Sequence, residues 1–182
     1  DSVKPFLQQK KMDFISAGWR VDPASDEARD VDVADFVTWN LQHLRGAFAW
    51  TVWDVLSALD FGYSLSEKIY GMIDEPPYVG KLGIMRLATR DPENFSLHID
   101  DGGMLLDDGI EQLYPARPQM PTWKFVYYPY QREFGNPYGM SDQRAAYDPY
   151  LAIVLITRFW NMYLERFGLP TESMVLLEVF PY

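Results

Sequence analysis

The stretch that decides the class of fold is Phe95-Ser96-Leu97-His98-Ile99-Asp100-Asp101-Gly102-Gly103-Met104-Leu105-Leu106-Asp107. It predicts two strands, Phe95 to Asp100 and Met104 to Asp107, joined by the turn Asp100 to Gly103. Glycine adopts a positive φ at little steric cost, which a tight hairpin turn requires. The centre of the chain is therefore expected to be antiparallel β-structure.

Further strands are expected on both sides of this hairpin. Apolar residues alternate with a period of two from Phe61 through Tyr63 and Leu65 and on towards Met72, which is typical of a strand. The other candidate strands are Leu82 to Thr89, Trp123 to Tyr130 and the short segment Trp19 to Val21. Pro115, Pro118 and Pro121 predict an irregular loop before the last long strand.

Helical spacing appears towards both ends of the sequence. Asp1 to Phe14 predicts a modest helix that stops before Gly18, and two helices follow, from Val31 to Gly46 and from Phe48 to Leu59. Their short link predicts an antiparallel pair packed side by side. Ser141 is expected to cap a short helix over 142–147. The longest helix is expected to open at Pro149 and to end at Gly168.

Together these elements predict an α+β fold. A helical pair and the long C-terminal helix would pack around a mainly antiparallel sheet, in a single domain over residues 1–182. Between sheet and long helix, Gly135 to Gly139 is expected to form an elbow with positive φ at its glycines.

Composition excludes several classes of function. The 182 residues include no cysteine, so disulfides and thiolate metal sites are excluded, and the net charge of -10 opposes tight, sequence-independent binding of nucleic acid. The longest uncharged apolar run, Leu151 to Ile156, falls far short of the roughly 20 residues that span a bilayer. The N-terminus has no secretory pattern. We expect a soluble, intracellular protein.

No catalytic or cofactor site is expected. His43 and His98 have no recognisable partner and are interpreted as structural. The pairs Asp100-Asp101 and Asp107-Asp108 could offer oxygen ligands to a hard cation, but their spacing matches no EF-hand, and two hairpin turns account for both. No metal or cofactor is therefore predicted.

The aromatic run Trp123-Lys124-Phe125-Val126-Tyr127-Tyr128-Pro129-Tyr130 has two interpretations. It could stack nucleic-acid bases, or it could be a strand that packs in a core or at a subunit interface; the acidic chain favours the second. Two other functions stay open: a carbohydrate-active hydrolase with a carboxylate pair drawn from Glu67, Asp74 and Glu75, and a protein-binding adaptor that uses the same aromatics.

Four segments, in this order, resemble the Mu-like portal protein family of tailed phages. Each alone is a weak signal, but their order and spacing hold from about Asp13 to Pro170. The segments are Gly18 to Asp26 with the helix that follows near Val33 to Val37, Leu59 to Glu67, Leu87 to Phe95, and a set of three motifs: Lys124 to Val126, Gly135 to Gly139 and Leu164 to Pro170.

The resemblance implies a structural protein and not an enzyme. Such a protein forms a ring, usually a dodecamer, at one vertex of the capsid, with double-stranded DNA passing through its centre. The implied partners are the major capsid protein, the terminase and the head-tail connector, and the implied location is the virion, with assembly in the host cytoplasm. This chain would be the peripheral wing. The residues implied in structure or assembly are Trp19, Glu67, Trp123, Asn136, Pro137, Tyr138, Gly139, Glu165, Arg166, Gly168 and Pro170.

Two features depart from the family pattern. The last helix is more apolar, over Ala152 to Ile156, than the family leads us to expect, and the sequence stops before the stem, clip and crown regions, so a fragment or a shortened relative is expected. The 6 Trp, 12 Tyr and 11 Phe exceed what one small core readily uses. We therefore expect several of Trp39, Trp50, Trp53, Trp123 and Trp160 to be buried or to contact neighbouring subunits.

Overall fold

A computed structural model of the chain describes residues 4–168. It divides into two compact units, Asp1–Arg144 and Ala145–Tyr182, which are described separately below. The predicted α+β class is confirmed, with two small antiparallel sheets and a long C-terminal helix. That the whole chain forms one domain stays a prediction.

Over its described residues, 4–144, the first unit contains four helices, two short 3₁₀ helices and six strands, before the start of α5. In chain order these are α1 (Lys4–Ser16), α2 (Ala28–Gln42), α3 (Phe48–Val55), α4 (Ala58–Phe61), β1 (Tyr63–Met72), β2 (Leu82–Arg90), η1 (Pro92–Asn94), β3 (Phe95–Ile99), β4 (Leu105–Gln112), β5 (Gln119–Met120), η2 (Thr122–Lys124) and β6 (Phe125–Pro129). One sheet has the order β2-β1-β6 and the other the order β3-β4-β5, with every neighbouring pair antiparallel.

The main core lies between the two sheets. Alternate residues of a strand point to the same face, and this alternation sends Tyr63 and Leu65 of β1 towards the second sheet. They pack with Phe95, Leu97, Ile110 and Phe125, all of which are buried. Full burial of one such side chain contributes about 1.5–3 kcal/mol, so this cluster holds the two sheets together.

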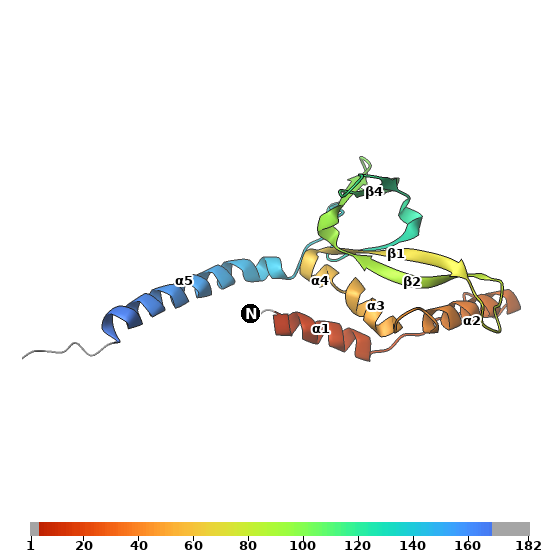
Figure 1. Cartoon of the computed structure of the whole chain (residues 1–182), viewed down its shortest axis with the longest axis horizontal. Helices are drawn as coiled ribbons and strands as arrows, with labels where there is room; N and C mark the ends of the chain where they lie inside the picture. Colours follow the sequence, from red (N-terminus) through yellow and green to blue (C-terminus); the bar gives the residue numbers. More distant parts are fainter. Residues whose placement is uncertain (1–3, 169–182) are drawn as a thin grey trace, which may run out of the picture. The chain divides into compact units, whose positions relative to one another are not determined.

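Helices α1, α2 and α3 lie on the other side of β1 and β2 (Figure 1). A second core joins Leu7 of α1 to Leu56 and Leu59. The expected side-by-side pairing of the two helices after Gly18 is wrong, because α2 and α3 each contact β2 and the helix that contacts α3 is α1. Helix α2 packs on the sheet, and α3 packs both on the sheet and on α1.

At the outer edge of β2, the Asn40 side chain and the Arg45 N–H make hydrogen bonds with the backbone in place of a neighbouring strand. Asn40 of α2 donates from Nδ2 to the carbonyl of Ile84 at 2.9 Å and accepts from the Ile84 N–H at 2.9 Å. The Arg45 N–H donates to the carbonyl of Met85 at 2.8 Å. These contacts take backbone groups that would otherwise be open to another strand.

Several predicted elements differ in the structure. Trp19 to Val21 is not a strand, since the segment links α1 to α2 without a partner strand, and the Trp19 ring packs edge-on against Phe48 at 4.9 Å. The second predicted helix divides into α3 and α4, because the chain bends at Leu56 with ψ near 0°.

Two predictions around the central hairpin also need correction. The turn Asp100 to Gly103 is confirmed, but Asp107 and Asp108 lie within β4 and not in a turn. A further short strand, β5, occupies part of the predicted proline loop, where Met120 pairs with Ile110. A strand of two residues is too short to show an alternation of apolar and polar residues in the sequence.

The second unit is described by α5 (Gln143–Phe167) from Ala145 onwards. Pro149 lies inside this helix, so the prediction that it opens the helix is wrong. The cap was placed correctly, since Ser141 Oγ accepts from the Gln143 N–H at 3.0 Å, but the helix continues from there without a break. None of the described helices is long and apolar enough to cross a membrane.

Candidate assembly site

The segment 131–142 joins β6 to α5 and is called the elbow. Gly135 has a φ of 74° and Gly139 a φ of 59°, as predicted. Asn136 closes the turn between them: its Oδ1 accepts from the Tyr138 N–H at 3.0 Å and its Nδ2 donates to the Gly139 carbonyl at 3.0 Å. Pro137, in the middle of this turn, is buried. The local sequence thus builds a compact turn.

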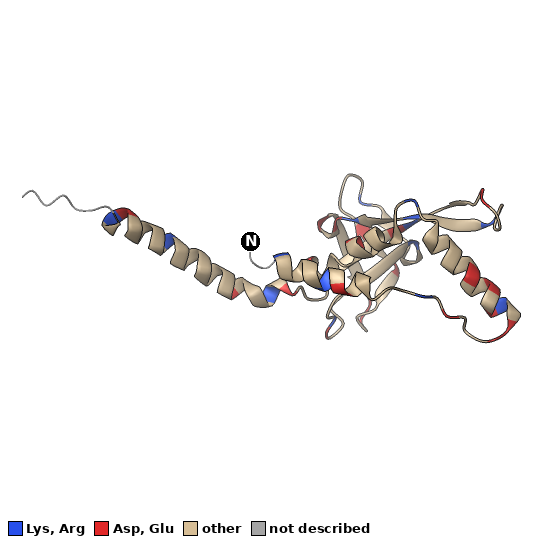
Figure 2. Cartoon of the chain, turned by 90° about the horizontal axis from the view of Figure 1, so that it is seen from below, with Lys and Arg blue, Asp and Glu red and all other residues tan. Residues whose placement is uncertain are grey.

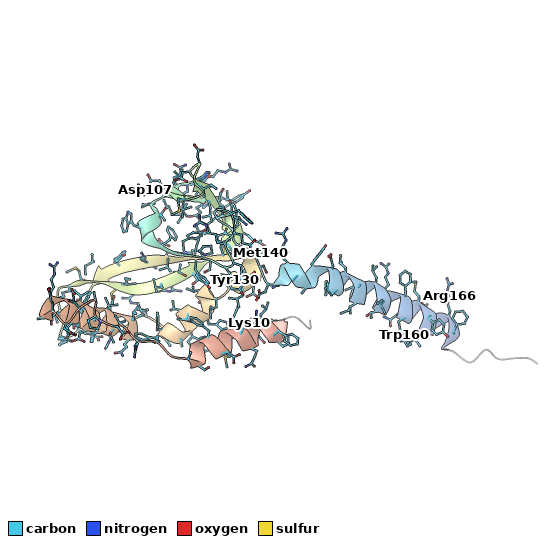
Figure 3. The ribbon with its side chains drawn as sticks, turned by 180° about the vertical axis from the view of Figure 1, so that it is seen from behind. Lys10, Asp107, Tyr130, Met140, Trp160 and Arg166 are labelled. Carbon is cyan, nitrogen blue, oxygen red and sulfur yellow. The ribbon has the colours of Figure 1, made fainter. Side chains whose placement is uncertain are left out.

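Gly62 and Gly139 allow the elbow to pack against the start of β1. The Tyr130 N–H donates to the Gly62 carbonyl and the Met140 N–H donates to the Tyr130 carbonyl, each at 2.7 Å; Tyr130 and Met140 lie side by side in Figure 3. A Cβ on Gly139 would lie less than 3.0 Å from the carbonyl oxygens of both Gly62 and Tyr130. No larger residue fits here.

A second pair of glycines brings the elbow against the tip of the central hairpin. A Cβ on Gly103 would lie 2.8 Å from the Cα of Gly135. The Arg132 guanidinium donates to the Gly103 carbonyl. The turn between β3 and β4 therefore also supports the elbow.

Tyrosines fix the elbow to the core between the sheets. The Tyr138 hydroxyl accepts from the Leu97 N–H of β3 at 3.2 Å, and its ring packs edge-on against Tyr63 at 5.4 Å. The Tyr127 hydroxyl donates to the Pro137 carbonyl. Burial raises the pKa of both Tyr63 and Tyr127, because the ionised phenolate would lose its hydration.

Charged residues fasten the end of the elbow to α1 and α4. Lys10 donates to Asp142 at 2.7 Å, and this hydrogen bond raises the pKa of Lys10. Lys11, which is buried, pairs with Asp60 at 2.5 Å and lies over the Trp53 ring. Ser141 Oγ donates to the Asp60 carbonyl at 2.6 Å. These contacts hold the end of the elbow, where α5 begins, against α1 and α4.

Of the other predicted site residues in the first unit, none joins the elbow. Glu67 on β1 pairs with Arg90 of β2 at 2.5 Å. Trp19 lies against α3. Trp123, in η2, is exposed, contacts Tyr70 with ring centroids 6.3 Å apart, and accepts a hydrogen bond at its carbonyl from Lys68. These residues are spread over the first sheet and the helices.

In the second unit, α5 carries a continuous apolar face. At 100° per residue, this face collects Ile153, Ile156, Phe159, Trp160, Tyr163 and Phe167, and no charged residue falls within it. All six are between 57% and 69% exposed. Figure 2 shows how few charged residues the helix has. The set is called the α5 face below.

The remaining predicted residues lie at the end of α5. Glu165 and Arg166 occupy its last turn, and Arg166 and Trp160 project from different sides of the helix (Figure 3). The Gly168 N–H donates to the Leu164 carbonyl at 2.7 Å, which ends the helix. Pro170 lies outside the described residues.

The histidines and the acidic pairs have structural contacts. His43 stacks on Trp39, and His98 lies 2.8 Å from Glu111. Asp100 Oδ1 accepts from the N–H groups of Gly102 and Met104, which explains its place in the turn. Within residues 4–168 no three His, Asp or Glu side chains gather as a metal site would need.

A family model described as the portal protein of Mu bacteriophage matches residues 1–175. The chain belongs to this portal family. No curated protein matches the chain. A portal protein is a structural part of the phage virion and not an enzyme, so the hydrolase alternative is wrong. Portal proteins work as oligomeric rings together with the capsid and DNA.

The portal assignment bears on the prediction that several tryptophans are buried or contact neighbouring subunits. Of the five tryptophans expected to be buried or in contact with neighbours, Trp39 and Trp53 are half-buried within the chain. Trp50, Trp123 and Trp160 are exposed by 61% or more, so burial within a single subunit is wrong for these three. Contacts with neighbouring portal subunits stay a prediction for them.

Sequence reasoning missed several residues that hold the elbow of this portal protein. They are Lys10, Lys11, Asp60, Tyr130 and Asp142. Their partners lie far apart in the chain, and a single sequence offers no signal for such pairs. Asp60 and Gly62 were noted within the Leu59 to Glu67 motif, and Tyr130 within the aromatic run, but their contacts with the elbow could not be predicted.

Proposed function

We propose that this chain is the wing of a portal subunit that assembles into a dodecameric ring at one vertex of the capsid. Double-stranded DNA passes through the centre of the ring without sequence-specific binding. The ring binds the terminase during packaging and the head-tail connector afterwards, and its periphery contacts the major capsid protein. Assembly takes place in the host cytoplasm, before the ring becomes part of the virion.

The observation that carries the proposal is the α5 face, together with the family assignment. Monomeric soluble proteins rarely expose contiguous apolar patches of more than a few hundred Å², and larger ones mark interaction sites. Six large apolar side chains, each more than half exposed, form such a patch on one helix. A ring subunit needs surfaces of this kind for its neighbours.

The charge of the chain supports passage of DNA. The net charge is -10, and an acidic surface repels phosphate. Duplex DNA can then move past the ring without being held by it.

We propose structural roles for three groups of the predicted site residues. Asn136, Pro137, Tyr138 and Gly139 fix the connection from the sheet to α5, and Glu165, Arg166 and Gly168 define where that helix ends. The part expected of Pro170, which lies outside the described residues, stays a prediction. Trp19, Glu67 and Trp123 belong to the surface and sheet of the wing. These roles are structural, and none involves chemistry on a substrate.

Ring formation by the full chain tests the proposal. Light scattering after size exclusion and negative-stain microscopy should show a closed ring of subunits at micromolar concentration. Trp160→Glu should abolish it, because it places a charge in the α5 face. Trp50→Glu, at a tryptophan of similar exposure on α3, is the matched control and should assemble normally. A wild-type chain that stays monomeric at every concentration would contradict the proposal.

A further inference from the structure

Helix α1 buries little of its own surface against the rest of the first unit. Its buried residues are Leu7 and Lys11, and with the half-buried Ile15 they recur every fourth position and form one narrow stripe. Leu7 packs on Leu56 and Leu59. The other side chains of α1 are exposed. Few buried apolar contacts are typical of a segment that opens locally while the remaining fold stays intact.

The segment 17–27, which joins α1 to α2, adds little to hold the helix in place. Between Trp19 and Asp26, as far as the structure describes the chain, no backbone group is hydrogen-bonded to another backbone group. All residues of the segment are exposed except Val21, which is half-buried. Eleven extended residues span up to about 36–40 Å, so α1 can leave the rest of the first unit without unfolding it.

Two adjacent lysines of α1 reach the end of the elbow. Lys10 pairs with Asp142 of the elbow itself, and its position beside the elbow can be followed in Figure 3. Lys11 pairs with Asp60, which in turn accepts a hydrogen bond from Gln143 at 3.3 Å. All of these residues belong to the first unit. Helix α1 therefore lies as a strap across the point at which the elbow ends and α5 begins.

The elbow that this strap holds is strained. Gln131 and Phe134 have φ values of 47° and 49°, in the left-handed region that residues other than glycine rarely adopt. Such conformations persist only where the surrounding contacts determine them. The Phe134 side chain is fully exposed, so its own packing does not compensate for the strain. The contacts that hold the elbow in this state come from its neighbours, α1 among them.

We infer that α1 is a releasable strap: its contacts hold the elbow in the strained state, and its departure lets the elbow relax. The inference goes beyond the proposed ring and does not depend on it. Hydrogen bonds to α4 and to the β3–β4 turn also hold the elbow, so release of α1 loosens the elbow without unfolding it. Because the chain passes into the second unit just after the elbow, a partner that removes α1 loosens the connection between the units.

Native-state hydrogen exchange of the full chain tests the inference. The N–H groups of Met140 and Asp142, which donate to the carbonyls of Tyr130 and Leu59, report on the elbow, and those of α1 report on the strap. In the wild type both sets should exchange with the same opening constant, and faster than the β1–β2 ladder. Segments that open together behave in this way, as one cooperative unit.

Leu7→Ala should release the strap. Exchange in α1 and at Met140 and Asp142 should rise about 30-fold or more, because the packing of a buried leucine is lost, while the β1–β2 ladder stays as in the wild type. Leu44→Ala is the matched control, at a leucine of similar burial outside the α1 cluster, and should leave both sets unchanged. Lys10→Met should raise exchange at the elbow about 2- to 5-fold, as loss of a half-exposed ion pair would.

The strain is tested at Phe134. Phe134→Gly relieves it, because glycine adopts a positive φ freely, whereas Phe134→Ala removes the same ring and keeps the strain. Exchange at Met140 and Asp142 should therefore be about five-fold slower in the glycine variant than in the alanine variant.

Three results would overturn the inference. Fast exchange in α1 with an elbow that stays protected, in the wild type or in Leu7→Ala, would show that the two open independently. Exchange of the elbow only together with the β1–β2 ladder would make α1 a fixed part of one cooperative fold. Equal rates in Phe134→Gly and Phe134→Ala would mean that the elbow holds no strain for the strap to restrain.

Discussion

Gly139 shows how a single residue of the elbow depends on both local and distant chain. Its positive φ follows from the local sequence Gly135-Asn136-Pro137-Tyr138-Gly139, and it was predicted for that reason. Its close approach to Gly62 and Tyr130 was not predicted, because those residues reach it only through the pairing of β1 with β6. Local turn chemistry can be read from the sequence, whereas the packing around a turn cannot.

Gly139→Val should destabilise the protein by about 2–5 kcal/mol. The variant combines backbone strain at positive φ with overlap of its Cβ on two carbonyl oxygens. Gly80→Val is the matched control, since Gly80 has a φ of +79° and no atom within 4 Å of its Cβ position. It should lose about 1–3 kcal/mol. Urea unfolding measures both, and equal losses would show that overlap at Gly139 has no effect.

At the scale of elements, the sequence predicted the helices and strands whose apolar residues repeat with a clear period or that end at a strong stop signal. The central hairpin, β1, β2, α2 and the end of the last helix at Gly168 all fall into this group. The misses have physical reasons: β5 is too short to show a period, and the order β2-β1-β6 depends on contacts between distant segments. Pro149 misled the prediction, because the cap at Ser141 starts α5 before the proline is reached.

Asn40→Ala tests the closed edge of β2. The variant leaves the Ile84 N–H and carbonyl without their partner in a partly buried place, which should cost about 1 kcal/mol in the free energy of unfolding. It should also increase aggregation, because an open strand edge pairs with other chains. Gln42→Ala, at an exposed position on the same helix, is the control and should lie within about 0.5 kcal/mol of the wild type.

Chemical denaturation and light scattering would follow these two effects separately. A stability of Asn40→Ala equal to that of Gln42→Ala would mean that water replaces the amide at no cost. An unchanged rate of aggregation would mean that the edge is protected by something other than Asn40.

For the whole molecule, the buried tyrosines determine how stability responds to alkaline pH. The pKa of Tyr63 lies above its ordinary value of 10.0 because burial opposes the phenolate. Above pH 10 the unfolded chain loses this proton while the folded chain keeps it, so the unfolded state gains stability. The pKa of Lys10 is also raised, from 10.5, by its hydrogen bond to Asp142. The stability that this protonated lysine contributes is therefore also lost as the pH rises.

The free energy of unfolding should therefore fall as the pH rises above about 10. Tyr63→Phe should make this fall shallower, at the cost of the hydrogen bond that Tyr63 donates to the Pro92 carbonyl at 2.6 Å. Tyr114→Phe, at a tyrosine that is 75% exposed, is the control and should leave the slope unchanged. Denaturant titrations at several pH values measure the slopes. A wild-type slope near zero up to pH 12 would contradict the prediction.

The elbow also has a consequence for the order in which the chain folds. Its anchors join Lys10 to Asp142 and Leu59 to Asp142, so they close long loops of chain. Contacts between distant segments form slowly, because the entropy of loop closure is lost before the contact contributes. The elbow is therefore the part of the first unit that we expect to form last, after β6 has paired with β1. A chain that has not reached this stage would lack the anchored start of α5 from which the second unit extends.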